Sequence, residues 1–341
     1  KTLFNGAHGP AAKRVKNLCA QCDTFLANNR SPHRAFVYDQ VVSFGELLST
    51  SIICAYLNHV GIAAEWVDAR SCIKTDNFYR SAHLNWEQTQ SAIQDQIQGN
   101  VLKVTQGFIA SDMNNFTTTL GREGSDYTAA IFAYCLGATD VTIWKDVQGV
   151  LNADPRVFDK TQLLEHISYQ EAIELAFYGA SVIHPKTLQP LQRKEIPLYV
   201  KSFLNPKQKG TKVGKGVPMQ PEIPCYIVKK GLSLLRLSTR DFSFVVEDNI
   251  SDIFKLLHEH KMSVDVIQNS AISFSVCVED TYHKMDALLL ALRSRFDVKH
   301  TPDVSLYTIR HFEENSANTL LSTHDLVLEQ RTATTLQLVL K

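Results

Sequence analysis

The feature that most constrains the fold is a change of pattern near residue 207. Before it, short apolar strand-like runs alternate with segments of helical apolar spacing, an order typical of an α/β domain with a largely parallel sheet. After it, a strand–helix–strand–strand order occurs twice, and the alternation of apolar residues along 274–278 recurs along 336–340. We therefore expect an α/β domain followed by two small α+β units that pack together.

Residues 205–216 separate the two patterns. They hold one Pro, three Gly and four Lys, which predicts a linker. A capping box, Ser168 with Glu171, predicts the start of a helix that Gly179 ends. The remaining spacings predict helices over 41–59, 125–136, 249–260 and 284–296, and strands over 62–67, 101–110, 141–144, 197–200, 232–240, 263–268, 272–279, 304–312, 326–329 and 334–341.

Charge and composition exclude several classes of protein. Lys plus Arg and Asp plus Glu are 35 each among 341 residues, so no basic surface for nucleic acid is expected. The longest apolar runs, such as Leu288–Leu292, fall far short of the ~20 residues that span a bilayer, and residues 1–20 contain no apolar signal-peptide core. Seven cysteines spread along the chain suit a reducing compartment. We expect a cytoplasmic protein without nucleic-acid or membrane partners.

The strongest local signal is the segment 117–129, TTTLGREGSDYTA. Its two glycines allow a tight turn, and Ser125 or Asp126 can cap the helix that follows. The free N–H groups of that helix would attract an anion, and Arg122 offers a fork suited to a carboxylate or a phosphate. An ordinary capped helix after a glycine turn remains the alternative.

Two further segments carry polar residues in informative places. Ser43 with Glu46 is a capping-box pattern, so Glu46 either closes its own helix or accepts a hydrogen bond from a substrate ammonium. Lys145 and Asp146 follow a strand, and Arg156 follows the next turn. Because ligands bind beyond the carboxyl ends of parallel strands, these three side chains are expected in the ligand crevice.

These segments together resemble one family. TTTLGREGSDYTAA, IWKDVQGVLNADPR, LEHISYQEAIELAFYGASVIHPKT and SFGE are similar to the aspartate kinase (aspartokinase) family of the amino-acid kinase fold. SLLRLSTR and SVDVIQNSAISFSV resemble the tandem ACT domains of that family. The resemblance implies a catalytic domain over 1–207 and an ACT regulatory region over 208–341, with the second ACT unit around 300–341.

The resemblance also implies an activity and the residues that perform it. Aspartate kinases transfer the γ-phosphoryl group of ATP, carried with Mg²⁺, to the β-carboxylate of L-aspartate, at the start of lysine, threonine and methionine synthesis. No metal ligands are expected from the protein. Matched by position, aspartate binding falls to Glu46, Phe108, Arg122 and Ser125; catalysis to Arg122 and to Asp126, which orients the catalytic lysine; and nucleotide binding to Lys145, Asp146, Leu151, Arg156 and Ser181.

The sequence also departs from the family pattern. The family opens with a strand and a Lys-Phe-Gly-Gly-Thr-Ser loop whose lysine bridges the ATP phosphates, and this sequence starts at Lys1 without them. Many relatives have Tyr at the position of Leu151 and Lys at that of Ser181. Two alternatives stay open: a catalytically silent amino-acid sensor, which the missing loop favours, and the kinase half of a fusion with homoserine dehydrogenase, which these departures do not test.

The ACT resemblance implies an effector site and an assembly. The effector is expected to be lysine, or threonine as second choice, although Ser270 precedes Ala271 where lysine-sensitive relatives have Glu. A homodimer or larger assembly through the ACT domains is expected. The effector residues are predicted to be Asn249, Ile250, Val264, Asp265 and Ser270.

Overall fold

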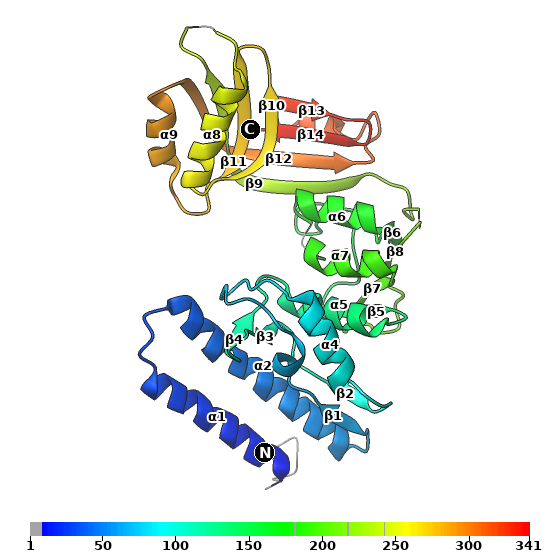
Figure 1. Cartoon of the computed structure of the whole chain (residues 1–341). Coiled ribbons are helices and arrows are strands. Elements are labelled where there is room, and N and C mark those ends of the chain that lie inside the picture. The colour runs from blue at the N-terminus through cyan, green and yellow to red at the C-terminus, as the bar shows by residue number, and fades with distance from the viewer. Residues whose placement is uncertain (1–8, 181, 217, 242) are drawn as a thin grey trace. The chain divides into compact units, whose positions relative to one another are not determined.

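A computed structural model of the chain describes residues 9–180, 182–216, 218–241 and 243–341 (Figure 1). The chain divides into two compact units, and it passes between them several times. The first unit holds residues 1–149, 166–173 and 182–217, and the second holds residues 150–165, 174–181 and 218–341.

Helices of the first unit surround a compact apolar core. The core includes Ile73, Ile93, Leu120 and Ile131, all of them buried. Helix α6 begins in the first unit and ends in the second. The helices are α1 (Pro10–Asn28), α2 (Arg34–His59), α3 (Ala69–Cys72), α4 (Trp86–Gln96), α5 (Gly124–Leu136), α6 (Tyr169–Tyr178) and α7 (Pro185–Lys194).

Three small sheets carry the strands of the first unit. β1 (Ala64–Trp66) pairs in parallel with β2 (Leu102–Val104), and β3 (Ile109–Ser111) pairs antiparallel with β4 (Thr117–Thr119). A four-stranded sheet has the order β5-β7-β8-β6, formed by β5 (Val141–Lys145), β6 (His166–Ser168), β7 (Leu198–Ser202) and β8 (Thr211–Gly214). β5 and β7 run parallel, as do β6 and β8. The expected α/β class with mainly parallel strands is confirmed.

Helix α2 starts earlier than its sequence pattern predicts. It begins at Arg34, so Ser43 lies inside the helix, where its hydroxyl donates to the carbonyl oxygen of Gln40 at 2.8 Å. The expected start near residue 41, and with it the capping box of Ser43 and Glu46, is therefore wrong. A serine inside a helix commonly donates to a carbonyl oxygen of the preceding turn. In the sequence such a serine cannot be distinguished from one that caps a helix start.

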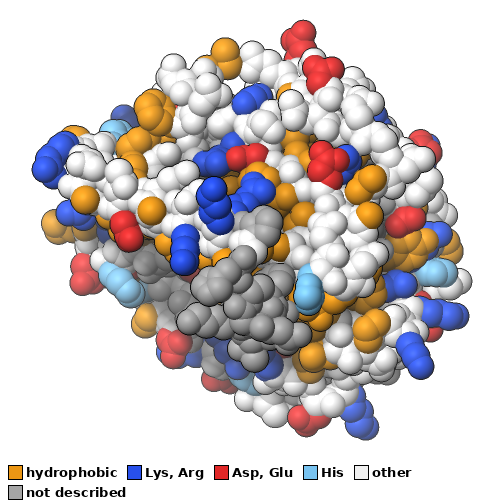
Figure 2. All heavy atoms as spheres, turned by 90° about the horizontal axis from the view of Figure 1, so that it is seen from below, with side chains coloured by type: hydrophobic (Ala, Val, Ile, Leu, Met, Phe, Trp, Pro, Cys, Tyr) orange, Lys and Arg blue, Asp and Glu red, His pale blue; other side chains and the backbone are white. Residues whose placement is uncertain are grey.

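Helix α2 is also unusually apolar. Within the described residues it is the one helix long and apolar enough to cross a membrane by length and composition. Its inner face nevertheless buries polar residues, Asp39 and Ser43 among them, as a helix of a folded domain does. Its outer face exposes Ile53 and Tyr56. Figure 2 shows hydrophobic side chains scattered between charged ones on the face seen from below.

The predicted linker contains a strand. Residues 211–214 form β8, which lies between β7 and β6 in the sheet. Thr211 and Val213 are buried while Lys212 between them is partly exposed, so the two-residue period of a strand was hidden among lysines and glycines. Gly210 makes the turn into β8 with φ 70°, where a Cβ would lie 2.0 Å from the carbonyl oxygen of Val200.

Most other expected elements form close to the predicted positions. α5 ends at Gly137 in the left-handed conformation (φ 61°). The backbone N–H of Glu171 donates to the Ser168 hydroxyl at 3.0 Å, as a cap of α6 requires. The run expected as one strand over 101–110 is two separate strands, β2 and β3, with Gln106 buried between them.

The second unit is built on one six-stranded antiparallel sheet. Its order is β10-β11-β9-β12-β14-β13. The elements are β9 (Cys225–Ser238), α8 (Glu247–Glu259), β10 (Ser263–Asn269), β11 (Ser273–Glu279), α9 (Met285–Arg293), β12 (Asp297–Arg310), α10 (Asn318–Leu321), β13 (Leu326–Arg331) and β14 (Thr335–Leu340). The order strand–helix–strand–strand occurs twice, as predicted, and the long strands β9 and β12 join the two copies.

The two faces of this sheet are buried differently. α8 and α9 cover one face, where Ile253 and Leu288 pack against Leu235 and Phe274 (Figure 1). On the other face, residues of all six strands share one apolar cluster: Leu232, Leu234, Val266, Cys277, Val304, Leu306, Leu328 and Val339. The Gln268 amide of β10 donates to the Glu329 carbonyl of β13 at 3.4 Å. The sheet therefore curls until its edge strands meet.

Candidate functional site

The N-terminus of α5 forms the centre of the site. Gly121 has φ 79° and Glu123 has φ 56°, so two left-handed residues turn the chain into the helix at Gly124. The N–H of Gly124 donates to the Gly121 carbonyl at 3.1 Å and closes the turn. The next N–H groups of α5 point out of the helix, where they favour an anion.

A second loop lies directly against this helix start. A Cβ on Gly107 would lie 2.8 Å from the side chain of Ser125, and a Cβ on Gly124 would lie 2.8 Å from the Phe108 ring. The N–H of Phe108 donates to the Thr128 hydroxyl at 3.0 Å, which holds the loop on α5. Two glycines thus permit a contact that side chains would prevent. Gly107 was missed by the sequence analysis, although a glycine beside Phe108 was the available signal.

These elements enclose one pocket with a volume of about 370 Å³. It brings together five of the residues predicted from the sequence, together with Glu123 and two glycines. Its lining is Phe108, Gly121, Arg122, Glu123, Gly124, Ser125, Asp126 and Lys145. Because most of the lining belongs to one turn, local sequence alone places these side chains side by side.

Lys145 is held by two carboxylates of α5 and its turn. Its ammonium lies 2.9 Å from Asp126 Oδ2 and 3.2 Å from Glu123 Oε2, and all three side chains are about one-fifth exposed. Burial opposes the charge, but the hydrogen bonds and negative charges of Asp126 and Glu123 outweigh it, so the pKa of Lys145 is raised. The site thus contains a permanent cation. Glu123 was not anticipated, because only the tertiary contact with β5 gives it a partner.

Arg122 and Ser125 face the pocket without internal partners. Both side chains are exposed, and within the described part of the chain no hydrogen bond or ion pair holds either of them. A guanidinium fork, a hydroxyl and a helix N-terminus form a recess rich in hydrogen-bond donors, in which Glu123 and Asp126 engage Lys145 and leave Arg122 unpaired among the described residues. Such a recess can bind a carboxylate and a phosphoryl group at the same time.

Glu46 lies on α2 and is not among the residues that line the pocket. Its half-buried position raises the pKa of its carboxyl, through loss of hydration. The capping alternative is excluded, since α2 begins twelve positions earlier at Arg34. The Glu46 carboxylate therefore does not cap the start of α2, which was the structural alternative to a role in substrate binding.

The nucleotide residues are only partly assembled. Lys145 and Asp146 belong to the first unit, while Leu151 and Arg156 belong to the second. Asp146 is exposed, and Leu151 forms an isolated bridge with Leu163. The Arg156 guanidinium pairs with Asp154 at 2.7 Å. Ser181 lies outside the described residues.

The predicted effector residues do not form an open site. Asn249 Oδ1 accepts a hydrogen bond from the N–H of Val246 at 3.0 Å and so caps its own helix. Ile250 and Val264 pack against the apolar core under α8 and α9. Ser270 bonds with Ser273 inside the turn between β10 and β11. In the absence of a ligand, local turns and the core hold these four side chains, and their assignment to an effector site stays a prediction.

Asp265 differs from the other four. A bulge between Val264 and Val266 turns it toward Lys229 of β9, whose ammonium lies 2.5 Å from Oδ1. The Asp265 side chain is only 7% exposed, and its Oδ2 has no partner within the described residues. Burial, and next the charge of Asp265, raise the pKa of the neighbouring Cys277 thiol to about 12. Asp265 is therefore a buried carboxylate that an internal lysine neutralises.

Lys229 also touches the end of α6. A Cβ on Gly179, which has φ 121°, would lie 2.9 Å from Lys229 Cε. The glycine is thus needed for its backbone conformation, and the flexible end of the lysine side chain lies close against it. The same lysine thus contacts Asp265 in the six-stranded sheet and the glycine that follows α6.

Fold and pocket together define an α/β protein with a helix N-terminus suited to anionic ligands and with a paired βαββ unit. Residues 6–202 match the amino acid kinase family, and the chain belongs to that family. Its similarity extends to aspartokinases. It is 35% identical over 246 residues to lysine-sensitive aspartokinase 3 of Escherichia coli, covering 71% of this chain and 55% of the relative. It is 36% identical over 251 residues to the chloroplastic aspartokinase 1 of Arabidopsis thaliana, covering 71% and 43%.

Solved structures give the same similarity over almost the whole chain. E. coli aspartokinase III in complex with lysine and aspartate has a TM-score of 0.79 at 27% identity, covering 96% of this chain and 77% of the other. The same enzyme with aspartate and ADP has a TM-score of 0.79 at 26% identity, covering 98% and 79%. The chain spans about half of the length of the curated relatives that it matches.

Proposed function

We propose that the chain is part of an aspartate kinase. A β-carboxylate oxygen of L-aspartate attacks the γ-phosphorus of ATP, the bond to the β,γ-bridging oxygen breaks, and 4-phospho-L-aspartate and ADP form. The observation that carries the proposal is the pocket at the N-terminus of α5, where Arg122, Ser125 and Lys145 converge. The similarity to aspartokinases bound to aspartate and to ADP supports the choice of substrates.

Each side chain has a task suited to its chemistry. Arg122 binds the α-carboxylate of aspartate through two parallel hydrogen bonds, with Ser125 and the first N–H groups of α5 beside it. Phe108 packs over the helix start and excludes water from the aspartate. Glu46 accepts hydrogen bonds from the α-ammonium. No general base is needed, because the attacking carboxylate is already ionised at neutral pH.

Lys145 supplies a fixed positive charge that stabilises the phosphoryl group in the transition state of its transfer. Phosphoryl transfer depends mainly on positioning and on stabilising charge at the equatorial oxygens. Asp126 and Glu123 keep Lys145 protonated and hold its position, so the cation needs no reorganisation during the reaction. Asp146, Leu151, Arg156 and Ser181 remain the proposed neighbours of the nucleotide.

Mg²⁺ is proposed to arrive with ATP, bound to its phosphates. Within the part of the chain that the structure describes, no three His, Cys, Asp or Glu side chains gather as a metal site. The pocket fits a metal–phosphate complex better than a bare metal ion, since Lys145 already engages Glu123 and Asp126 and Arg122 prefers anionic oxygens.

We propose regulation by an amino acid, with lysine as the first choice and threonine as the second. One relative is named lysine-sensitive, and one similar structure contains lysine. The ammonium of the effector would replace Lys229 at Asp265 and would use the unpartnered Oδ2. Displaced Lys229 would lose its place against Gly179, so that effector binding would change the contacts at the end of α6. We further propose a cytoplasmic homodimer or larger assembly formed through the regulatory sheet.

Trapping of the acyl phosphate tests the proposed reaction. The chain, MgATP and L-aspartate are incubated with hydroxylamine, which converts acyl phosphates into coloured hydroxamates, while calorimetry measures aspartate binding directly. We expect binding and hydroxamate with L-aspartate, and neither with L-glutamate, whose additional methylene misplaces the carboxylate. A chain that binds no L-aspartate refutes the proposal.

A further inference from the structure

Asp39 on α2 is a fully buried carboxylate that the proposed reaction does not use. Oδ2 accepts hydrogen bonds from the N–H groups of Arg80 and Thr119, each at 2.9 Å. Oδ1 accepts from the Thr119 hydroxyl at 2.9 Å and shares the Arg80 N–H at 3.1 Å. Burial alone raises the pKa of this carboxyl, and the surrounding donors offset part of that rise. Such a group is retained in a core only where its bonds hold something in place.

The donors belong to the elements that support the Arg122 turn. Arg80 adopts the left-handed conformation with φ 70°, and its carbonyl oxygen lies 3.2 Å from where a Cβ on Gly121 would be. The N–H of Ala82 donates to the Thr119 carbonyl at 2.9 Å, so the loop and β4 are joined to each other. Together they form the platform on which Gly121, the residue before Arg122, is seated.

The acceptor belongs to the helix that carries Glu46. Seven residues are about two helical turns, so Glu46 lies on the same side of α2 as Asp39, about 10 Å further along the axis. A displacement of α2 against β4 would therefore change the distance from Glu46 to Arg122 directly. Within the described residues, Gln40 adds the neighbouring side-chain link, through its amide and the backbone of Thr117.

We propose that Asp39 is a positioning residue for amino-acid binding. Its carboxylate locks α2 to β4 at the register that lets Glu46 hold the α-ammonium while Arg122 holds the α-carboxylate of the same molecule. The inference rests on the proposed function, because it assumes that an amino acid occupies the pocket.

A carboxylate is required because every group that faces it is a donor. Two oxygens with about four lone-pair sites accept all the bonds from Arg80 and Thr119. In Asp39→Asn one oxygen becomes an NH₂ group that faces an N–H. The variant therefore loses part of the lock and gains a donor–donor repulsion, with little change in volume.

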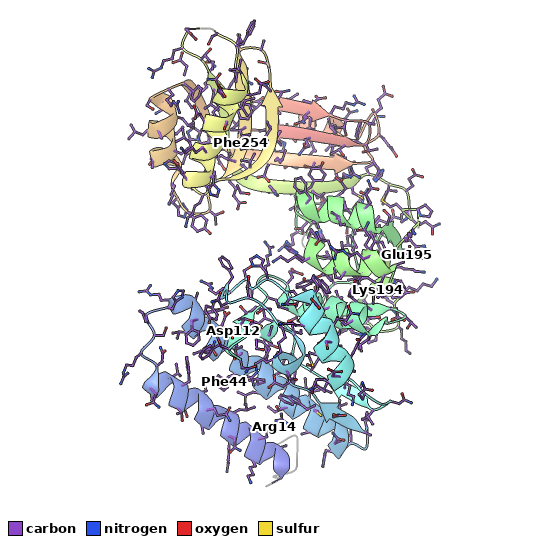
Figure 3. All side chains as sticks on the ribbon, viewed as in Figure 1. Arg14, Phe44, Asp112, Lys194, Glu195 and Phe254 are labelled. Atoms are coloured by element: carbon purple, nitrogen blue, oxygen red, sulfur yellow. The ribbon has the colours of Figure 1, made fainter. Side chains whose placement is uncertain are left out.

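The matched control is Asp112→Asn (Figure 3). Asp112 is also buried, and its Oδ1 accepts from the N–H groups of Asn114 and Phe116 at 2.9 Å. It stabilises the turn between β3 and β4, at the end of β4 remote from Gly121. Asp112 Oδ2 also accepts from the Tyr79 hydroxyl at 3.4 Å, but within the described residues its carboxylate makes no bond to α2. Both variants thus remove one buried carboxylate that accepts from backbone N–H groups, and only Asp39→Asn removes a bond to α2.

Calorimetry on the whole chain gives the decisive measurement. For Asp39→Asn we expect the Kd of L-aspartate to rise at least tenfold and the Kd of MgATP to stay within twofold. The Kd of succinate, which lacks the ammonium and does not need Glu46, should rise less than threefold. Asp112→Asn should bind all three ligands within twofold of the unchanged chain.

The outcomes separate this inference from the proposed function. If the unchanged chain does not bind L-aspartate, the proposed function fails. If it binds and Asp39→Asn binds equally well, or if succinate and aspartate weaken equally, the positioning role is refuted. Should Asp39→Asn fail to fold, Thr119→Val removes only the hydroxyl donor. In that variant we expect the Kd of L-aspartate to rise three- to fivefold and the Kd of MgATP and of succinate to stay unchanged. An unchanged Kd of L-aspartate in that variant overturns the inference.

Discussion

The pocket at the start of α5 and the Asp265 carboxylate on β10 differ in whether their polar side chains are already paired within the protein. In the pocket, Arg122 and Ser125 are exposed and have no partner within the described residues. On β10, Asp265 is buried and already paired with Lys229. A ligand in the pocket gains contacts that nothing else makes, whereas a cation at Asp265 must first compete with a side chain of the protein.

The difference indicates how each region should respond to ligand. An open pocket whose Arg122 is unpaired in the described part of the chain binds a ligand by simple addition, so its affinity reflects the contacts themselves. A site occupied by an internal lysine binds only as far as the ligand outcompetes that lysine, and each binding event moves a side chain. The second arrangement is the one suited to regulation, because occupancy and conformation are coupled.

The largest effect is expected when the fixed cation of the pocket is removed. Lys145→Met should lower kcat by about two to three orders of magnitude, as loss of a transition-state charge contact does. It also leaves Asp126 and Glu123 facing each other without their shared cation. Initial-rate kinetics measure the change. Lys194→Met is the control, since Lys194 lies at the end of α7 and donates to the Tyr134 carbonyl outside the pocket (Figure 3). A kcat within fivefold of the original would remove Lys145 from the reaction.

Arg122→Ala should have the next largest effect. An unpaired α-carboxylate costs about 2–3 kcal/mol, so the Kd of L-aspartate should rise about 30- to 150-fold. The melting temperature should stay within a degree or two, because Arg122 is exposed. Calorimetry and thermal unfolding test both statements. Arg30→Ala serves as the exposed control. Unchanged aspartate affinity would return Arg122 to an ordinary surface role.

Lys229→Met tests whether the Asp265 carboxylate of the second unit is neutralised by Lys229, in contrast to Arg122 of the pocket, which has no partner among the described residues. Asp265 loses its cation, and we expect the free energy of unfolding to fall by about 1–2 kcal/mol, less than for a fully buried pair since Lys229 is partly exposed. L-lysine or L-threonine should then restore stability at lower concentrations than the original chain needs. Lys215→Met breaks the exposed pair with Glu195 and should change almost nothing.

The same effector measurement on Asp265→Asn completes that comparison. Without the carboxylate, neither amino acid should stabilise the chain, and a double variant with Lys229→Met should recover part of the lost stability. Stabilisation by lysine that survives Asp265→Asn would place the effector elsewhere.

Glu46→Gln is expected to have the smallest effect. Removal of a charge-assisted contact should weaken L-aspartate about five- to tenfold at neutral pH. Because burial raises the pKa of Glu46, aspartate affinity in the original chain should fall as the pH is lowered toward that raised pKa, at a higher pH than for an exposed glutamate. Affinity measured across pH in both proteins should show this loss only in the original chain. Parallel pH profiles would contradict the role of Glu46.

The stability of the same variant provides a check on sign. A carboxyl whose pKa is raised in the folded chain favours folding when protonated, and that contribution is lost as the pH rises through the raised pKa. At neutral pH the charged Glu46 is therefore slightly unfavourable for folding. Glu46→Gln should melt at the same temperature or slightly higher, while it binds aspartate less well.

Local sequence was sufficient for the pocket because its residues are neighbours along the chain. Arg122, Ser125 and Asp126 lie within one turn and the first turn of α5, so the glycine spacing that predicts the turn also places the side chains. The repeated strand–helix–strand–strand order was equally readable, since each copy has its own apolar period. The start of α2 could not be predicted, because Ser43 bonds a carbonyl of the preceding turn and its sequence pattern is that of a helix cap. The strand β8 could not be predicted either, because its alternation of buried and exposed residues lies among lysines and glycines.

Contacts between residues distant along the chain were decided by the tertiary structure alone. Asp39 meets Thr119 eighty positions away, Lys145 at the end of β5 meets Glu123 at the start of α5, and Asp265 meets Lys229 where β10 has a bulge. No periodicity encodes such pairs, since their formation depends on how complete elements pack. The sequence by itself determined the elements, the glycine turn and the family resemblance. Packing decided which charges are already neutralised and which remain available to a ligand, because burial removes water and makes each buried charge depend on its partner.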